Sequence, residues 1–234
     1  PLIEMGKRHV RFIPEVLYVE SKNLPRYPIQ IEEITKSLAI SMKPASHRAP
    51  VDIVVLPNGQ VDQLKQTIQG VQSHIHESHT ITVLFSAEGL ALSRYQKLYQ
   101  ELDSVKFFPI QNLKTDLLNF LRNASNYVVV TSDDVCLSHD ISLKKMSSIL
   151  SDTSAYGFYL GLGEKGHHHK DFFETDLKHS SPEYIQKGIY SWKIGKAQGD
   201  YKFPNNLEFS LYPKILLFAE LSQMEFEDIQ SLKT

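Results

Sequence analysis

Between residues 51 and 134, short apolar segments alternate with longer amphipathic ones, and this alternation constrains the fold more than any other feature. The apolar segments are rich in β-branched and aromatic residues and span 51–57, 80–86, 105–110 and 127–134. Such continuous apolar runs are typical of strands buried in a parallel sheet. The amphipathic segments between them span 61–75, 88–102 and 115–125, and their apolar residues recur at helical spacing.

Alternating strands and helices predict an α/β fold, in which an open, mostly parallel, Rossmann-like sheet has helices on both faces. Each crossover is long enough for a right-handed βαβ unit. Ligands bind such sheets outside the carboxyl ends of the strands. Asn58, Ser86 and the segment 132–134 follow those ends. The sequence therefore predicts a binding site at this edge.

The alternation is confined to part of the chain. We expect residues 1–49 to be an N-terminal arm with a short strand at 16–20 and a helix at 29–42. Prolines break any longer helix before residue 30. We expect residues 50–234 to form a single domain with an irregular second half. In that half, the pattern predicts a helix at 140–152, strands at 155–163 and 189–195, and a strand and a helix divided near Pro213.

Composition excludes several classes of protein. Lys and Arg total 25 and Asp and Glu total 27, which gives a formal net charge of −2. With no basic excess, we expect no nucleic acid or anionic membrane partner. No apolar window approaches the roughly 18 residues of a transmembrane segment. The single cysteine, Cys136, excludes an intrachain disulfide and fits a reducing compartment, so we expect a cytoplasmic protein.

The acidic pair Asp133-Asp134 is the most informative motif, because the apolar run YVVVTS delivers it to a strand end. Neighbouring residues of an extended strand point to opposite faces, so one carboxylate could reach a ligand while the other braces the loop. Mg²⁺ and Mn²⁺ take oxygen ligands, usually one or two carboxylates together with substrate phosphates. The alternative is a capping or turn role, which is common for Asp at strand ends.

Three stretches resemble GT-A-fold glycosyltransferases of the family-two type. PVDIVVLPNGQVDQLKQTIQGVQSH resembles their opening strand, loop and helix, and TDLLNFLRNASNYVVVTSDDVCLSHD resembles the segment that leads into their metal-binding acidic motif. YSWKIGKAQGDYKFPNNLEFSLYPKILLFAEL resembles their tryptophan-containing strand, acidic loop and acceptor-side segment. The resemblance covers roughly residues 50–230, in order.

The resemblance implies a nucleotide-diphospho-sugar donor used with Mn²⁺ or Mg²⁺. It assigns Asp133 and Asp134 to the metal, with Ser132 and Asp133 also beside the nucleotide-sugar. Pro57 and Asn58 would lie beside the nucleotide. Residues 50–135 would then be the nucleotide-sugar-binding half and residues 136–234 the acceptor-side half.

The same resemblance gives roles to three further residues. Glu88 would help to bind the nucleoside after the second strand, and Trp192 would offer a stacking surface. Asp200, in a G-D-Y triplet, would be the general base that takes the proton of the acceptor hydroxyl. The acceptor would be a glycan, a lipid or a protein. From the residues alone, Trp192 is better explained as core and Asp200 as an exposed turn residue.

Two departures from the family pattern keep alternatives open. The acidic motif reads Ser132-Asp133-Asp134 and so lacks one carboxylate, and the second strand is followed by Ser86-Ala87-Glu88, which displaces the acidic residue. A catalytically inactive GT-A-like domain that binds a glycan or protein is one alternative. A nucleotidyltransferase on a similar sheet is another.

The histidines and the cysteine have simpler interpretations. We expect His74, His76 and His79 to form a polar helix end and residues 167–169, all His, to lie in a solvated loop. We expect Cys136 to be a small buried apolar residue, because no Cys/His/Asn pattern supports a nucleophile.

Overall fold

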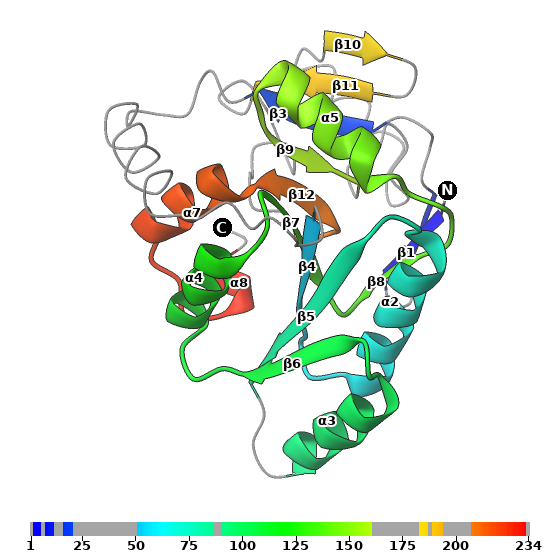
Figure 1. Ribbon diagram of the computed structural model, residues 1–234, viewed down its shortest axis with the longest axis vertical. Coiled ribbons are helices and arrows are strands. Elements are labelled where there is room, and N and C mark those ends of the chain that lie inside the picture. The colour runs from blue at the N-terminus through cyan, green and yellow to red at the C-terminus, as the bar shows by residue number, and fades with distance from the viewer. Residues whose placement is uncertain are drawn as a thin grey trace.

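The computed structural model in Figure 1 describes residues 2–5, 8–11, 16–20, 51–86, 90–160, 183–186, 189–193 and 207–232. The region of predicted alternation forms β4 (Val51–Leu56), α2 (Val61–His74), β5 (His79–Phe85), α3 (Leu90–Glu101), β6 (Val105–Pro109), α4 (Leu113–Asn123) and β7 (Tyr127–Ser132). After it come β8 (Val135–Leu137), α5 (Leu143–Thr153), β9 (Ala155–Tyr159), β10 (Glu183–Gln186), β11 (Ile189–Trp192), β12 (Ser210–Pro213), α7 (Lys214–Gln223) and α8 (Ile229–Leu232). Before it lie β1 (Leu2–Met5), β2 (Arg8–Arg11) and β3 (Val16–Glu20).

Nine strands of the described chain form one sheet in the order β10-β11-β3-β9-β12-β7-β4-β5-β6. The predicted strands β7, β4, β5 and β6 are its contiguous parallel part. β12 and β9 continue the sheet with antiparallel pairing. β3, from the predicted arm, lies antiparallel to β9 and parallel to β11 within this sheet. β8 forms a second sheet with β1 and β2.

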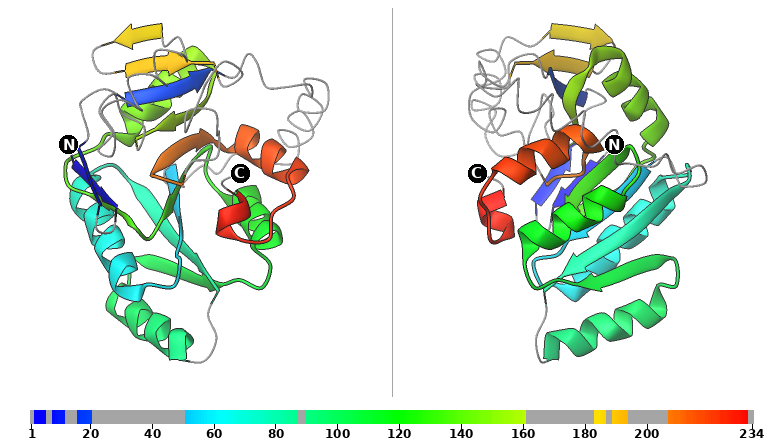
Figure 2. Two further views of the ribbon diagram at one scale, coloured as in Figure 1. Left: turned by 180° about the vertical axis from the view of Figure 1, so that it is seen from behind. Right: turned by 60° about the vertical axis from the view of Figure 1, so that its left-hand side comes forward.

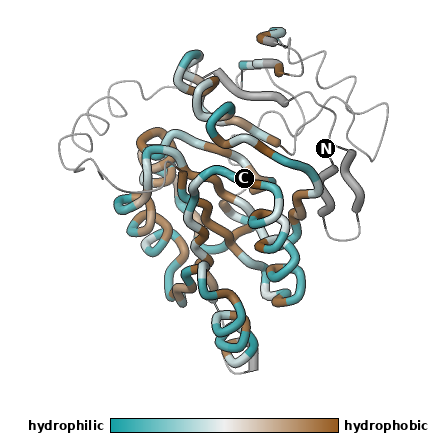
Figure 3. Tube along the Cα trace, turned by 45° about the vertical axis from the view of Figure 1, so that its right-hand side comes forward, coloured by the Kyte–Doolittle hydropathy of each residue, from teal (hydrophilic) through white to brown (hydrophobic). Residues whose placement is uncertain are grey.

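Helices cover both faces of the sheet, as predicted (Figures 1 and 2). Ile53 and Val55 of β4 belong to the apolar core shared with α2, α3 and α5. Val54 and Leu56, which alternate with them, belong to the core shared with α4, α7 and α8. Alternate residues of a strand point to opposite faces, so the apolar run from residue 53 to residue 56 supplies both cores. Figure 3 shows hydrophobic strands inside and mixed helices outside.

Several boundaries and elements differ from the prediction. α4 begins at Leu113, and its N-cap is Asn112, whose side chain accepts a hydrogen bond from the Thr115 backbone N–H. Thr115 is therefore inside the helix rather than at its cap. β1, β2, β8 and β10 were not predicted, because their short sequences carry little periodicity and their pairing partners are distant in the chain. The predicted helix at 29–42 lies outside the described residues. No helix among the described residues is long and apolar enough to cross a membrane.

Candidate functional site

The carboxyl ends of β4, β5 and β6 open into a cavity of about 310 Å³, which we call the strand-end pocket. Pro57 and Asn58, after β4, line it together with Ser86, after β5. Gln111, after β6, and the segment 227–230 before and within α8 complete the wall. The predicted residues Pro57 and Asn58 therefore lie at the edge of the sheet where ligands bind in α/β folds.

Asp133 ties the turn after β7 to the loop after β4. Its Oδ2 atom accepts hydrogen bonds from the backbone N–H groups of Asn58 at 3.0 Å and Gln60 at 3.4 Å. Its backbone oxygen accepts a hydrogen bond from the Thr67 hydroxyl of α2 at 2.8 Å. The side chain is 1% exposed. Asp133 thus braces the loop that carries Asn58 into the strand-end pocket.

The second carboxylate oxygen of Asp133 is buried in a place that disfavours its negative charge. The Oδ1 atom is buried and has no hydrogen-bond partner. Burial raises the pKa of the Asp133 carboxyl, the N–H groups of Asn58 and Gln60 lower it, and the neighbouring charge of Asp134 raises it further. The net direction is upward because burial disfavours the ionised form most strongly. An unpartnered buried carboxylate oxygen with a perturbed pKa is a feature of functional sites.

Ser132 and Asp134 flank Asp133 and differ in exposure. Ser132 is buried, and its hydroxyl donates hydrogen bonds to Asp134 Oδ1 and, at 3.4 Å, to the Leu207 backbone oxygen. Asp134 is only partly buried. Asp133 is buried and braces the loop, whereas Asp134 is the carboxylate that a ligand could reach. This is the division of roles expected for two adjacent residues at a strand end.

The described residues fit a divalent cation held partly by its ligand, but not one enclosed by protein. No group of three or more His, Cys, Asp or Glu side chains that could hold a metal occurs among them. Mg²⁺ and Mn²⁺ need only one or two carboxylates when substrate phosphates complete the coordination. Asp134, which is partly exposed, would supply the accessible oxygen, whereas the Oδ1 atom of Asp133 is buried beneath the turn.

The other predicted site residues do not join this cluster. Trp192 is 2% exposed and packs in the core, with its ring centroid 5.7 Å from that of Tyr159. This burial leaves almost none of its surface to a ligand and matches the core interpretation. Glu88 and Asp200 lie outside the described residues, as do the histidines at 167–169.

Three parts of the site were missed from the sequence. Gln111 follows β6 as Asn58 follows β4, and the same strand-end reasoning would have found it. Tyr95 of α3 is buried without a partner for its hydroxyl, and burial together with the Asp133 charge raises its pKa to about 12. The segment 227–230 is far from the strands in sequence. Asp228 caps α8 by accepting from the Ser231 N–H at 2.8 Å, which signals a helix start but not its packing.

A cluster of histidines lies away from the strand-end pocket. His74 Nδ1 lies 3.1 Å from Asp140 Oδ1, and His76 Nε2 lies 3.3 Å from Asp140 Oδ2. His79 Nδ1 lies 2.8 Å from the Glu77 backbone oxygen. These contacts agree with the expected polar helix end. Cys136 is partly exposed rather than buried, because it lies on the short strand β8 at the margin of the core.

Comparison with known proteins gives matches in structure only. No protein-family model matches the chain, and no curated protein matches it in sequence. The chain is similar in structure to glycosyltransferases. One is the mannosyltransferase PcManGT from Pyrobaculum calidifontis in complex with GDP-Man and Mn²⁺, with 12% identity, a TM-score of 0.46 and coverage of 78% of this chain and 56% of that one.

Two further solved structures give similar values. S. aureus TarS 1-349 matches at 12% identity and a TM-score of 0.46, over 77% of this chain and 52% of that one. The bifunctional glycosyltransferase WbbM, in its apo structure, matches at 13% identity and a TM-score of 0.42, over 81% of this chain and 37% of that one. The chain thus spans about half or less of the length of these proteins. Similarity this distant establishes neither a shared ligand nor a shared reaction.

Proposed function

We propose that this chain is a glycosyltransferase that binds a nucleotide-diphospho-sugar at the strand-end pocket with Mn²⁺ or Mg²⁺. The observation that carries the proposal is the pair of hydrogen bonds from Asn58 N–H and Gln60 N–H to Asp133 Oδ2. Asp134 follows Asp133 in the same turn, and these bonds hold Asp133 against the loop that lines a pocket at the carboxyl ends of parallel strands. This is where α/β folds bind nucleotides.

The lining of the strand-end pocket suits the nucleoside and the diphosphate of the donor in different ways. The described lining is apolar or neutral on the strand side, with Asn58, Ser86 and Gln111 as polar groups, which suits an uncharged nucleoside. This described lining contains no Lys or Arg, and it includes Glu227 and Asp228. A diphosphate placed there needs a cation to offset its charge.

The chain's own residues would then act in sequence. Asp133 holds the loop after β4 in place, so that Asn58 presents its polar groups to the donor. Asp134 would hold the cation, which would supply positive charge to offset that of the diphosphate. We propose Asp200 as the base that takes the proton of the acceptor hydroxyl, and a glycan, lipid or protein as the acceptor. The base role predicts that Asp200→Ala loses transfer while nucleotide binding persists.

Isothermal titration with UDP and with GDP, each with and without Mn²⁺, tests the proposal. We expect one nucleotide to bind only when Mn²⁺ is present, and Asp134→Ala to weaken that binding by about tenfold or more, since a charged ligand contact is worth at least 1.4 kcal/mol. Asp140→Ala removes an exposed carboxylate outside the strand-end pocket and is the matched control. Binding that ignores Mn²⁺, or falls equally in both variants, contradicts the proposal.

A catalytically inactive binding domain is the second candidate. The hydroxyl of Ser132 stands where the resemblance leads us to expect a carboxylate, and it hydrogen-bonds Asp134, so this motif offers fewer acidic oxygens to a cation. Incubation with UDP-sugars and GDP-mannose separates the candidates. Release of a nucleoside diphosphate supports the enzyme, metal-dependent binding without release supports the binding domain, and release of pyrophosphate supports a nucleotidyltransferase.

A further inference from the structure

In the part of the chain that the structure describes, one area of the parallel strands is covered only partly by helices. On β5, Ile81, Val83 and Phe85 face the core below α2 and α3, whereas Thr80 and Thr82 alternate with them on the opposite face. Strands of a parallel sheet are normally apolar on both faces because helices cover both. The two threonines therefore indicate that this face of β5 borders a polar space rather than a closely packed helix.

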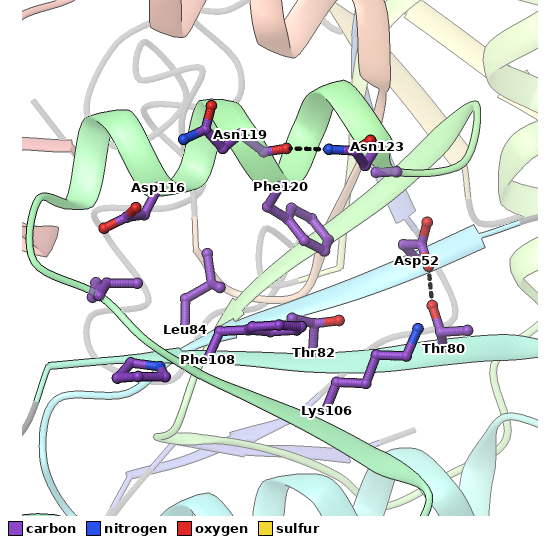
Figure 4. A pocket seen from close by; sticks show the side chains of 13 residues that line it. Asp52, Thr80, Thr82, Leu84, Lys106, Phe108, Asp116, Asn119, Phe120 and Asn123 are labelled. Carbon is purple, nitrogen blue, oxygen red and sulfur yellow. Dashed lines mark hydrogen bonds between the residues drawn. The ribbon is translucent and has the colours of Figure 1, made fainter. Parts of the chain in front are cut away.

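A groove of about 580 Å³ lies over this face, between α4 and strands β5 and β6, and we call it the α4 groove. Figure 4 shows Phe120 reaching into it from α4, and Phe108, Thr82 and Lys106 rising from the strands below. The volume falls within the range of about 300–1,000 Å³ that is usual for small-molecule sites.

The two aromatic rings give the α4 groove an apolar surface that water reaches. Phe108 is 50% exposed, and Phe120 is partly exposed. Phe120 also packs against the core on the α4 side, whereas Phe108 belongs to neither apolar core. An exposed aromatic face gains free energy when a ligand with an apolar face covers it.

The polar groups of the α4 groove carry charges of both signs. Lys106 disfavours cations, while Asp52 and Asp116 disfavour anions. Asp52 is buried, and its carboxylate already accepts hydrogen bonds from the Thr80 hydroxyl and from the Ser125 N–H, the latter at 2.5 Å. Asp52 is therefore a fixed part of the groove wall, and its carboxylate is not free to bind a cation.

From these observations we infer that the α4 groove is a binding site for a neutral sugar. A pyranose ring has an apolar face that suits Phe108 and Phe120. Its hydroxyls can accept hydrogen bonds from the Lys106 ammonium and either donate to or accept from the Thr82 hydroxyl. This site is distinct from the acidic pair after β7. It shares Leu84 and Ile110 with the strand-end pocket, so a sugar chain bound in the groove would extend toward that pocket.

Saturation-transfer NMR on the full chain, with maltotriose, mannotriose and chitotriose as probes, tests this site. We expect ring protons of at least one sugar to receive saturation, and titration to show weakening by about tenfold in Phe108→Ala and in Thr82→Val. Phe108→Tyr keeps the ring and should keep the binding. Tyr99→Ala removes an exposed aromatic residue of α3, which is 55% exposed and lies outside the groove, and should change nothing.

Three results would overturn the inference. The first is no saturation transfer to any of the three sugars. The second is sugar binding that Phe108→Ala and Thr82→Val leave unchanged. The third is uridine binding with the same dependence on these residues, which would assign the groove to nucleosides. None of these results depends on Asp134, so the titrations with UDP, GDP and Mn²⁺ remain a separate test of the proposed function.

Discussion

At the scale of single residues, the Asp133 carboxylate combines a structural role with an energetic cost. It accepts two backbone hydrogen bonds that position Asn58, yet its Oδ1 atom is buried without a partner. A buried polar atom left without a hydrogen bond costs about 1–3 kcal/mol. Such a cost is retained where the group serves a ligand, which is the role proposed for this turn.

The raised pKa of Asp133 predicts how stability depends on pH. Between the pKa of the unfolded chain and the higher pKa of the folded one, the folded protein binds more protons, so the free energy of unfolding falls as pH rises. Asp133→Asn removes this titration while its amide oxygen can still accept from Asn58. We expect urea unfolding to show that the free energy of unfolding of the variant increases relative to that of the parent protein as pH rises from about 4 toward neutral.

Asp103→Asn is the control for that series, because Asp103 is exposed and the substitution removes the same charge. The control should preserve the pH dependence of the parent protein. A pH dependence that survives in Asp133→Asn as well would show that the ionisation of Asp133 does not limit stability.

At the scale of elements, β9 depends on a close approach that only glycine allows. A Cβ atom at Gly157 would lie 2.9 Å from two ring carbons of Tyr212 in β12 and 3.0 Å from the Tyr159 hydroxyl. Tyr212 is buried, so its ring has little room to move. We expect Gly157→Ala to lower the free energy of unfolding by about 1–3 kcal/mol, the usual cost of overpacking.

A double-mutant cycle with Tyr212→Ala identifies the cause. If the contact with the Tyr212 ring is responsible, Gly157→Ala costs less in the Tyr212→Ala background than in the parent protein. An equal cost in both backgrounds would assign the effect to the β9 backbone instead.

The elements also show which features local sequence can predict. β4, β5, β6 and β7 were predicted because each is an apolar run with its own boundaries. β10 and β1 were not, because their strand structure comes from pairing with partners that the chain supplies elsewhere.

The candidate site divides in the same way. Asn58 and Asp133 were both predicted at the binding edge of the sheet because each follows the end of a strand, and a hydrogen bond joins them there. The wall formed by 227–230 depends on how α8 packs, which periodicity does not encode. Sequence alone also left open whether Trp192 was exposed, and its burial follows from its position on β11.

At the scale of the whole molecule, the α4 side of the sheet carries both candidate binding surfaces. The strand-end pocket lies at the carboxyl ends of β4, β5 and β6, and the α4 groove continues from it along the face of β5 and β6. On the opposite face, α2 and α3 pack closely on the strands (Figures 1 and 2). Both faces carry a buried apolar core, and the proposed ligands would occupy the α4 side.

Paramagnetic broadening by Mn²⁺ in amide NMR spectra, recorded with UDP or GDP present, tests the location of the site most directly. We predict that the nucleotide and Mn²⁺ together broaden the amide signals of Asn58, Ser86 and Asp134, and that Asp134→Ala abolishes this effect. Broadening centred instead on the surface cluster of His74, His76 and Asp140, unaffected by Asp134→Ala, would contradict a cation-dependent nucleotide site at the strand ends.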